Sequence, residues 1–245
     1  MHLKYKFFKH YIMKFLFVYA VCFALVAVPE SKSYEDGFDE IIVISDLREK
    51  NISTAATSME IINSEVIERR KAQHIDTLLN TVANVNFASG ASRGRFVQIR
   101  GIGERSQFVE PINPSVGVLL DGIDISGTNG AALTLDLDRI EILRGPQGTI
   151  NGANALAGLI NLKSNRPEAI KSGKLKIGFG NYEARTIDGS YSIPISETSK
   201  FRIAVGRTLN NGFMSNDFLD RDNTNNIDES AIKSMFDWQP TDNLT

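Results

Sequence analysis

The sequence predicts a small mixed α+β domain followed by antiparallel strands of the transmembrane β-barrel type. Three observations support this prediction. The chain of 245 residues opens with a basic and then apolar segment that is typical of exported proteins. Short helix and strand patterns follow up to about residue 167, and longer strands with regular apolar–polar alternation come after them. The fold class is therefore a mixed small sheet with short helices, joined to the first antiparallel strands of an incomplete barrel.

The N-terminus has the pattern of a secretory signal peptide. Four lysines precede the apolar run Phe15–Val28, and small residues follow at Ser31 and Ser33. The apolar run is shorter than the roughly 20 residues of a spanning helix, which disfavours the alternative of a membrane anchor. We therefore expect residues 1–33 to be a signal peptide that is cleaved after Ser33.

The composition after cleavage excludes several classes of function. Removal of residues 1–33 takes away five lysines and one glutamate, so the formal charge changes from −2 to about −6. An acidic chain of this kind argues against a nucleic-acid partner. Cys22 leaves with the leader, and His74 is the histidine that remains. No metal-ligand cluster and no catalytic constellation is visible, so we predict no cofactor, no metal site and no enzymatic activity.

The segment after the leader begins with an isolated strand pattern and continues with helix. "DEIIVIS", residues 39–45, is β-branched with apolar residues on both faces, and it lacks an obvious partner strand. "NSEVIERRKAQHIDTLLNTVANV" reads as two short helices, with Ser64 as the cap and a break near Gln73. We interpret His74 as an ordinary helix residue because no second metal ligand lies near it.

Strands joined by tight turns follow from Phe87 onward. "RFVQIRGIG" is a strand that ends in glycines, and "SVGVLLDGIDI" is a hairpin with Asp121-Gly122 as its turn. "DRIEILRG" and "GLINLKS" enclose a Gly-rich stretch that could bind phosphate or permit close packing of the backbone. This stretch lacks the Gly-Lys-Ser/Thr of a Walker loop and the G-x-G-x-x-G of a dinucleotide loop. We therefore interpret its glycines as structural.

Four strands of about ten residues are expected after Arg166-Pro167. "KLKIGFG", "TIDGSYSIPI", "FRIAVGR" and "AIKSMFDWQ" alternate apolar with polar or small residues. The turn "SETS" is short, whereas the connection from Asn210 to Glu229 is long and polar, as in outer-membrane barrels. We expect its acidic part, residues 217–229, to be a solvated loop rather than a calcium site. Tyr182 and Trp238 lie near strand ends, where aromatic girdles occur. A soluble antiparallel sheet with one wet face remains the alternative.

These motifs together resemble the TonB-dependent outer-membrane receptors. The matching stretches occur in the family's order: "DEIIVIS", "IRGIG", "VLLDGIDI", "RIEILRGPQGT" and "NRP". The family usually has an aromatic residue at Asn151 and often a glycine at Ala157. The resemblance implies a TonB-box segment at 34–45, a plug domain at 46–167 and the first about four barrel strands at 168–245. Because four strands cannot close a barrel, we expect the chain to be the N-terminal fragment of a longer receptor.

The resemblance also assigns roles to particular residues. Arg100, Arg144 and Glu141 are expected at plug–barrel contacts, and the stretch 102–115 is the candidate substrate loop, with Glu104, Arg105, Gln107 and Phe108 as its candidate residues. The TonB box comprises Asp39, Glu40, Ile41, Ile42, Val43, Ile44 and Ser45. The glycines expected in plug turns are Gly101, Gly103, Gly145, Gly148, Gly152 and Gly158.

The function implied is TonB-dependent import of a scarce solute across the outer membrane of a Gram-negative bacterium. The solute class is a siderophore-iron complex, cobalamin or an oligosaccharide, and the partners are outer-membrane lipid and TonB with its inner-membrane energising complex. Two alternatives stay open. One is a plug-like periplasmic binding module, and the other is a fragment without transport activity.

Overall fold

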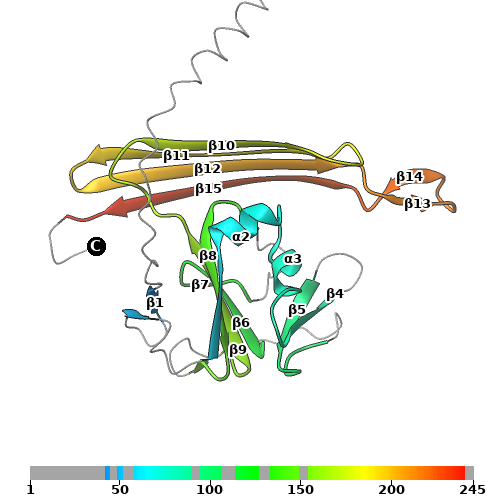
Figure 1. Cartoon of the computed structure of the whole chain (residues 1–245), viewed down its shortest axis with the longest axis horizontal. Coiled ribbons are helices and arrows are strands. Elements are labelled where there is room, and N and C mark those ends of the chain that lie inside the picture. Colours follow the sequence, from blue (N-terminus) through cyan, green and yellow to red (C-terminus); the bar gives the residue numbers. More distant parts are fainter. Residues whose placement is uncertain are drawn as a thin grey trace, which may run out of the picture. The chain divides into compact units, whose positions relative to one another are not determined.

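The computed structural model describes residues 42–44, 49–51, 58–89, 94–105, 114–126, 133–148 and 154–240. All of them belong to one compact unit, Ile42–Thr245. The predicted signal peptide lies outside the described residues. The described part contains a mixed domain, residues 58–164, and a sheet of longer strands after residue 171, which we call the long sheet (Figure 1).

The mixed domain is built on a five-stranded sheet with the order β3-β8-β9-β6-β7. Most neighbours are antiparallel, whereas β6 and β9 are parallel, which makes the sheet mixed. The strands are β3 (Ser58–Asn63), β6 (Val116–Leu120), β7 (Ile123–Asp124), β8 (Leu137–Arg144) and β9 (Gly158–Ser164). A separate hairpin pairs β4 (Val85–Ser89) with β5 (Gly94–Ile99).

Two short helices follow β3, with the predicted break between them. They are α2 (Ser64–Arg69) and α3 (Ile75–Leu79). The N-cap of α2 is Asn63 and not Ser64, because the Asn63 side chain accepts the backbone N–H of Val66 at 3.0 Å. The prediction of Ser64 as the cap is therefore wrong by one residue.

One face of the five-stranded sheet and the two helices share a continuous apolar core. Its fully buried members include Leu78, Ile99, Val118, Ile140, Ile142, Ile160 and Leu162. The alternate residues of β8 and β9 point to this core, as period-two packing requires. The hairpin between β6 and β7 turns at Asp121 and Gly122, whose φ angles are 51° and 88°. Both positive angles match a two-residue type I′ turn, which confirms the predicted hairpin.

The long sheet is antiparallel and has the order β10-β11-β12-β15. Its strands are β10 (Ser172–Phe179), β11 (Arg185–Ser196), β12 (Ser199–Asn210) and β15 (Ile227–Trp238). Two residues join β11 to β12, and the long connection before β15 carries a small hairpin of β13 (Met214–Asn216) and β14 (Arg221–Thr224). A mixed domain with short helices that precedes antiparallel strands is the predicted fold class, which is confirmed.

The strand predicted in "DEIIVIS" has a partner. β1 (Ile42–Ile44) pairs antiparallel with β2 (Glu49–Asn51). The partner was not obvious from the sequence, because "EKN" is polar and pairs through its backbone N–H and C=O groups. Within the described ranges, no helix has the length and apolar character needed to cross a membrane.

Candidate functional site

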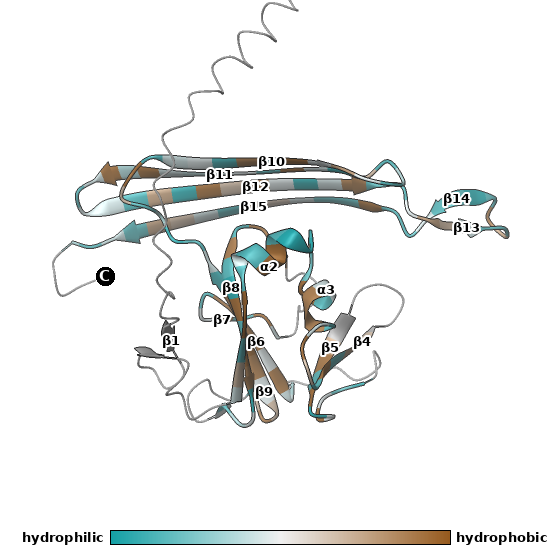
Figure 2. Cartoon of the chain, in the orientation of Figure 1, coloured by the Kyte–Doolittle hydropathy of each residue, from teal (hydrophilic) through white to brown (hydrophobic). Residues whose placement is uncertain are grey.

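Hydrophobic and hydrophilic residues alternate along the strands of the long sheet (Figure 2). Successive residues of a strand point to opposite sides, so the predicted alternation sorts the side chains by polarity. On the polar face, Ser192, Arg202 and Ala204 are buried. The opposite face exposes large apolar side chains: Leu175, Ile177, Phe179, Ile187, Tyr191, Ile203, Val205, Ile232, Phe236 and Trp238. Exposed apolar residues on one side and covered polar residues on the other are the pattern of a sheet that faces lipid.

A buried ion pair joins the polar face to the mixed domain. Arg202 of β12 donates from Nε and Nη2 to the two carboxylate oxygens of Asp136, at 2.7 Å each. Its remaining N–H groups reach the hydroxyls of Ser192 at 3.0 Å and Ser190 at 3.1 Å, and the Glu168 carboxylate lies 3.5 Å away. The side chains of Arg202 and Asp136 are only 9% and 8% exposed. A two-pronged, desolvated contact of this kind fixes orientation as well as position.

Asp136 is itself held in place at the start of β8. Its backbone carbonyl accepts the N–H of Asn165 at 3.1 Å, and its carboxylate accepts the Asn165 amide at 3.0 Å. Its φ angle of 54° puts it in the left-handed region that aspartate and asparagine tolerate better than most residues. The carboxylate that Arg202 binds is thus held in a hydrogen-bonded turn.

A second cation from the long sheet binds the same turn. Lys233 of β15 donates to the carbonyl of Leu135 at 2.8 Å and to the hydroxyl of Ser164 at 3.0 Å. Ser164 in turn donates from its hydroxyl and its backbone N–H to Asp121, at 2.6 and 2.8 Å. Gly206 leaves space for the turn, because a Cβ there would lie 3.0 Å from the Leu135 side chain. We call residues 133–136 the anchor turn.

Side-chain contacts of Glu68 and His74 also connect the helical segment of the mixed domain to the long sheet. Glu68 of α2 accepts Lys174 at 2.5 Å and Lys176 at 2.9 Å, and these ammonium groups hold the pKa of the Glu68 carboxyl below its usual value. His74, at the N-cap of α3, is buried, and its Nε2 lies 2.7 Å from the Glu229 carboxylate on β15. His74 is therefore not the ordinary helix residue that the sequence suggested, since it contacts the long sheet.

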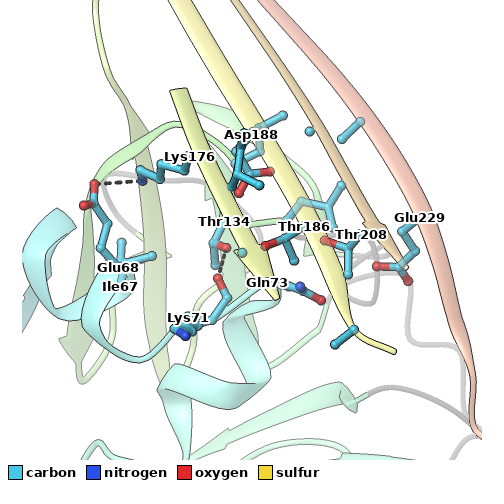
Figure 3. A pocket seen from close by; sticks show the side chains of 18 of the residues that line it. Ile67, Glu68, Lys71, Gln73, Thr134, Lys176, Thr186, Asp188, Thr208 and Glu229 are labelled. Atoms are coloured by element: carbon cyan, nitrogen blue, oxygen red, sulfur yellow. Dashed lines mark hydrogen bonds and ion pairs between the residues drawn. The ribbon is translucent and has the colours of Figure 1, made fainter. Parts of the chain in front are cut away.

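A cavity of about 510 Å³ lies between these contacts (Figure 3). The mixed domain contributes α2, the residues that follow it and the anchor turn, and the long sheet contributes its polar face. The labelled side chains of Thr186, Asp188 and Thr208 lie on the sheet side of the view. The register places the lining residues of the sheet in two rows, Gly178–Thr186–Thr208–Glu229 and Lys176–Asp188–Gly206–Ala231. No group of three metal-binding side chains occurs among the residues that the structure describes.

Comparison with known proteins identifies the mixed domain. The model of the TonB-dependent receptor plug domain matches residues 51–159. Residues 51–159 are the plug domain of a TonB-dependent receptor. Over 186 residues the chain is 24% identical to the pesticin receptor of Yersinia pestis, and over 181 residues it is 23% identical to the vitamin B12 transporter BtuB of Vibrio cholerae. These matches cover 75% and 71% of the chain.

Solved structures of such receptors show the same fold. The ferric yersiniabactin uptake receptor FyuA of Yersinia pestis superposes with a TM-score of 0.65 at 22% identity, covering 75% of this chain. The FpvAI–pyocin S2 complex gives 0.67 at 16% identity, covering 82% of this chain. The chain spans only 27% and 28% of the two curated relatives, and 29% and 26% of the two structures.

The family also bears out two further expectations. It consists of transport receptors and not of enzymes, in agreement with the prediction. Its members are outer-membrane proteins of Gram-negative bacteria, which confirms the predicted location. TonB-dependent receptors as a class bind small solutes such as siderophores.

The structure places the residues expected at plug–barrel contacts as follows. Arg144 donates to Glu60 of β3 and to the carbonyl of Ala83, so its observed partners lie inside the plug. Glu141 is fully buried and accepts Arg139 at 2.8 Å and Asn161 at 2.9 Å. Burial lowers the pKa of Arg139, but Glu141 and Asp138 outweigh it and raise that pKa. Arg100 is exposed, with a positive φ of 54°. Their contact with a barrel wall stays a prediction.

The plug glycines differ in what they do. Gly101, Gly103 and Gly145 have positive φ angles of 80°, 147° and 111°, which suit glycine in a turn. Gly158 allows close packing, because a Cβ there would lie 2.5 Å from the Leu143 carbonyl and 2.6 Å from the Ile99 side chain. Gly148 has open space around it, and Gly152 lies outside the described residues.

The candidate substrate loop is described only at its ends. Glu104 accepts the backbone N–H of Ser115 at 3.0 Å and its hydroxyl at 2.8 Å, which joins the two ends of the loop. Arg105 is exposed, and its guanidinium lies 3.4 Å from the Gly101 carbonyl. Gln107 and Phe108 lie outside the described residues. The TonB box is described in part. Ile42, Val43 and Ile44 form β1, and the other four residues, Asp39, Glu40, Ile41 and Ser45, lie outside the described residues.

Reasoning from the sequence missed the residues that hold plug and long sheet together. Asp136, Arg202 and Lys233 were not singled out, and Glu229 was read only as part of an acidic loop. The available signal was Arg202 itself, a charged residue on a strand of strong apolar alternation. A charge at such a position faces the inside of a barrel, so it needs a partner there.

Proposed function

We propose that the chain is part of a receptor that imports a scarce solute across the outer membrane by TonB-dependent active transport, with the plug gating the barrel. One observation carries the proposal. The anchor turn of the plug is bound to the polar face of a sheet whose opposite face is apolar and exposed. A domain held against the inner face of a lipid-facing wall can block the lumen and admit solute when it shifts.

The energy source that we propose is a TonB transducer, which binds the box at residues 39–45. β1 belongs to a two-stranded sheet with β2 among the described residues. Addition of a partner strand to the other edge of β1 is a known mode of peptide recognition, in which main-chain hydrogen bonds provide affinity. Proline at residue 42 removes a backbone donor and restricts φ, so it prevents this pairing.

The solute class that we propose is an iron–siderophore complex, cobalamin or an oligosaccharide. The relatives support the first two classes, since they include a ferric yersiniabactin uptake receptor and a vitamin B12 transporter. These activities belong to those proteins, and they suggest which solutes to test first.

Uptake by whole cells tests this proposal. Cells that lack their own receptors are given this receptor gene, and uptake of ferric yersiniabactin, ferripyoverdine, vitamin B12 and a labelled oligosaccharide is measured with and without TonB. We expect TonB-dependent uptake of one solute, its loss in Ile42→Pro and its retention in the matched variant Ile42→Val. Uptake that persists without TonB, or in Ile42→Pro, contradicts the proposal. Release of the protein by alkaline washing of membranes would instead support a periplasmic binding module.

A further inference from the structure

The apolar face of the long sheet carries charged side chains at one end. The register arranges the residues of this face in rows that run across β10, β11, β12 and β15. Within these four strands the charged members of the face are Arg185, Arg207 and Asp228. They stand in the last two rows, Ile177–Ile187–Arg207–Ser230 and Phe179–Arg185–Leu209–Asp228. Apolar, aromatic or small residues occupy the other rows.

The length of the connections identifies this end of the sheet as the extracellular one. Two residues join β11 to β12 at the opposite end, whereas the long connection with β13 and β14 joins β12 to β15 at this end. Outer-membrane barrels have short periplasmic turns and longer extracellular loops. Asp228 precedes Trp238 by ten residues on β15. Ten residues of a strand tilted by about 40° rise about 26 Å, close to the roughly 25 Å height of the apolar band in such barrels. The two arginines therefore lie near the level of the outer headgroups.

An aromatic pair at the same end of the sheet supports this level. The rings of Tyr182, in the turn between β10 and β11, and Phe213, in the long connection, have centroids 6.0 Å apart. The Tyr182 carbonyl accepts the backbone N–H of Asn211 at 3.0 Å, which joins the turn to the connection. Both rings are more than half exposed. Exposed aromatic rings near strand ends are typical of the interface between bilayer and water.

Arg185 and Arg207 are placed so that both can reach one anion. The register partner of Arg185 is Leu209, two residues from Arg207, so the arginines are diagonal neighbours about 7–8 Å apart. Arg207 donates one N–H to Asp228 at 3.3 Å, and a nitrogen of Arg185 lies 3.8 Å from Glu183. All four side chains are more than half exposed, so both pairs are weak. Because a guanidinium has five N–H donors, each arginine retains donors for a further acceptor.

We propose that Arg185 and Arg207 bind the phosphate of an outer-leaflet lipid whose acyl chains lie along the apolar rows. The ligand class is a phosphorylated glycolipid, the lipid of the leaflet that surrounds this end of the wall. Phosphate oxygens match the planar fork of a guanidinium, and Ile177 and Ile187 offer apolar surface beside it. The site is on the outside of the wall, so it goes beyond the proposed import and does not depend on it.

Lipid binding to the purified receptor in detergent tests the proposal. Native mass spectrometry measures the affinity for lipid A with two phosphates and for the same lipid A after enzymatic removal of both. We expect the double variant Arg185→Gln, Arg207→Gln to bind the phosphorylated form about tenfold more weakly or worse, and the dephosphorylated form within about twofold of the parent. Arg221→Gln is the matched control, because Arg221 is an exposed arginine of β14, outside the four strands, and it should bind like the parent. Parent-like binding by the double variant, or an equal loss in Arg221→Gln, would overturn the inference.

A variant with the opposite sign keeps the test valid if the arginine variants do not assemble. Asp228→Asn removes the carboxylate that competes with phosphate for Arg207, so it should bind phosphorylated lipid A more tightly, by about two- to fivefold. Unchanged or weaker binding by Asp228→Asn would contradict the proposal.

Inorganic phosphate separates a lipid site from a general anion site. We expect an equimolar amount of inorganic phosphate to leave bound lipid A in place, because the acyl chains contribute to its affinity. Displacement of lipid A by inorganic phosphate would overturn the assignment to a lipid. None of these measurements involves TonB or uptake, so their failure would leave the proposed import intact, and a failure of import would leave this site intact.

Discussion

The plug and the long sheet bury opposite kinds of side chain. In the plug, Leu78, Ile140 and Leu162 are completely buried and form an ordinary apolar core. In the long sheet, Ser192 and Arg202 are buried while Ile232 is 78% exposed. The plug therefore buries apolar side chains, as water-soluble proteins do, whereas the long sheet buries polar side chains and exposes apolar ones.

The difference teaches where each region gets its stability. Apolar burial stabilises the plug by removing carbon from water, at roughly 25 cal/mol per Å². The buried apolar clusters contain no residue of the long sheet, so the sheet depends on main-chain pairing and on the plug against its polar face, and we expect lipid to cover its apolar face. Loss of the ion pairs between the two regions should consequently lower the stability of both.

The largest effect is expected for the buried pair. Arg202→Leu leaves the Asp136 carboxylate buried without a cation, which should cost about 3–5 kcal/mol. Denaturant titration of the purified receptor in detergent measures the change in unfolding free energy. Arg69→Leu is the control, because its pair with Glu65 on α2 is exposed and should contribute less than about 1 kcal/mol. Equal effects of the two variants would remove the distinction between buried and exposed pairs.

A smaller effect is expected when a charge is placed at an exposed isoleucine, and it depends on whether lipid or water surrounds that residue. Ile232 of the long sheet and Ile123 of the plug are exposed to similar extents, 78% and 69%. In the bilayer Ile232→Lys should destabilise the receptor by about 2–4 kcal/mol near the midplane, because it puts a charge into lipid. Ile123→Lys should change the stability by no more than about 0.5 kcal/mol. If unfolding from vesicles shows the reverse order, the apolar face of the long sheet does not face lipid.

The smallest effect concerns pH at the Glu68 pairs. The folded-state pKa of Glu68 is depressed below the ordinary 4.5. The contribution of Glu68 to folding stability is therefore present above pH 4.5 and is lost as the pH falls through the folded-state pKa. Glu68→Gln should therefore be less stable than the parent receptor at neutral pH, by under about 1 kcal/mol because the group is partly exposed. The two stabilities should converge as the pH falls through the folded-state pKa of Glu68. A stability difference that stays constant as the pH falls from neutral to strongly acidic would exclude an ionic origin.

Local patterns in the sequence predicted much of this fold. Apolar–polar alternation assigned Ile203 and Arg202 to opposite faces, and Asp121-Gly122 predicted its hairpin. Both predictions depend on neighbouring residues, whose geometry is set by the pleat and by the turn. The helix boundary was less certain, because Asn63 and Ser64 are both good capping residues and the structure shows that the Asn63 side chain accepts the Val66 N–H.

The candidate site could be predicted only in part. Asp136 and Arg202 are 66 residues apart, and no local period connects them. Their pairing depends on how the plug sits against the sheet, which a single sequence does not encode in any short motif. The Arg144–Glu60 contact illustrates the same limit, since the register of β3 with β8 decides it.

The contact of Arg202 with Asp136 also sets the registration of the plug along the wall. Side chains on one face of a strand repeat every two residues, so the smallest slip that keeps the polar face inward brings Ala204 or Lys200 opposite Asp136. Ala204 offers no charge, and Lys200 lacks the planar fork that grips both carboxylate oxygens. The pair thus selects a single position of the plug along the long sheet.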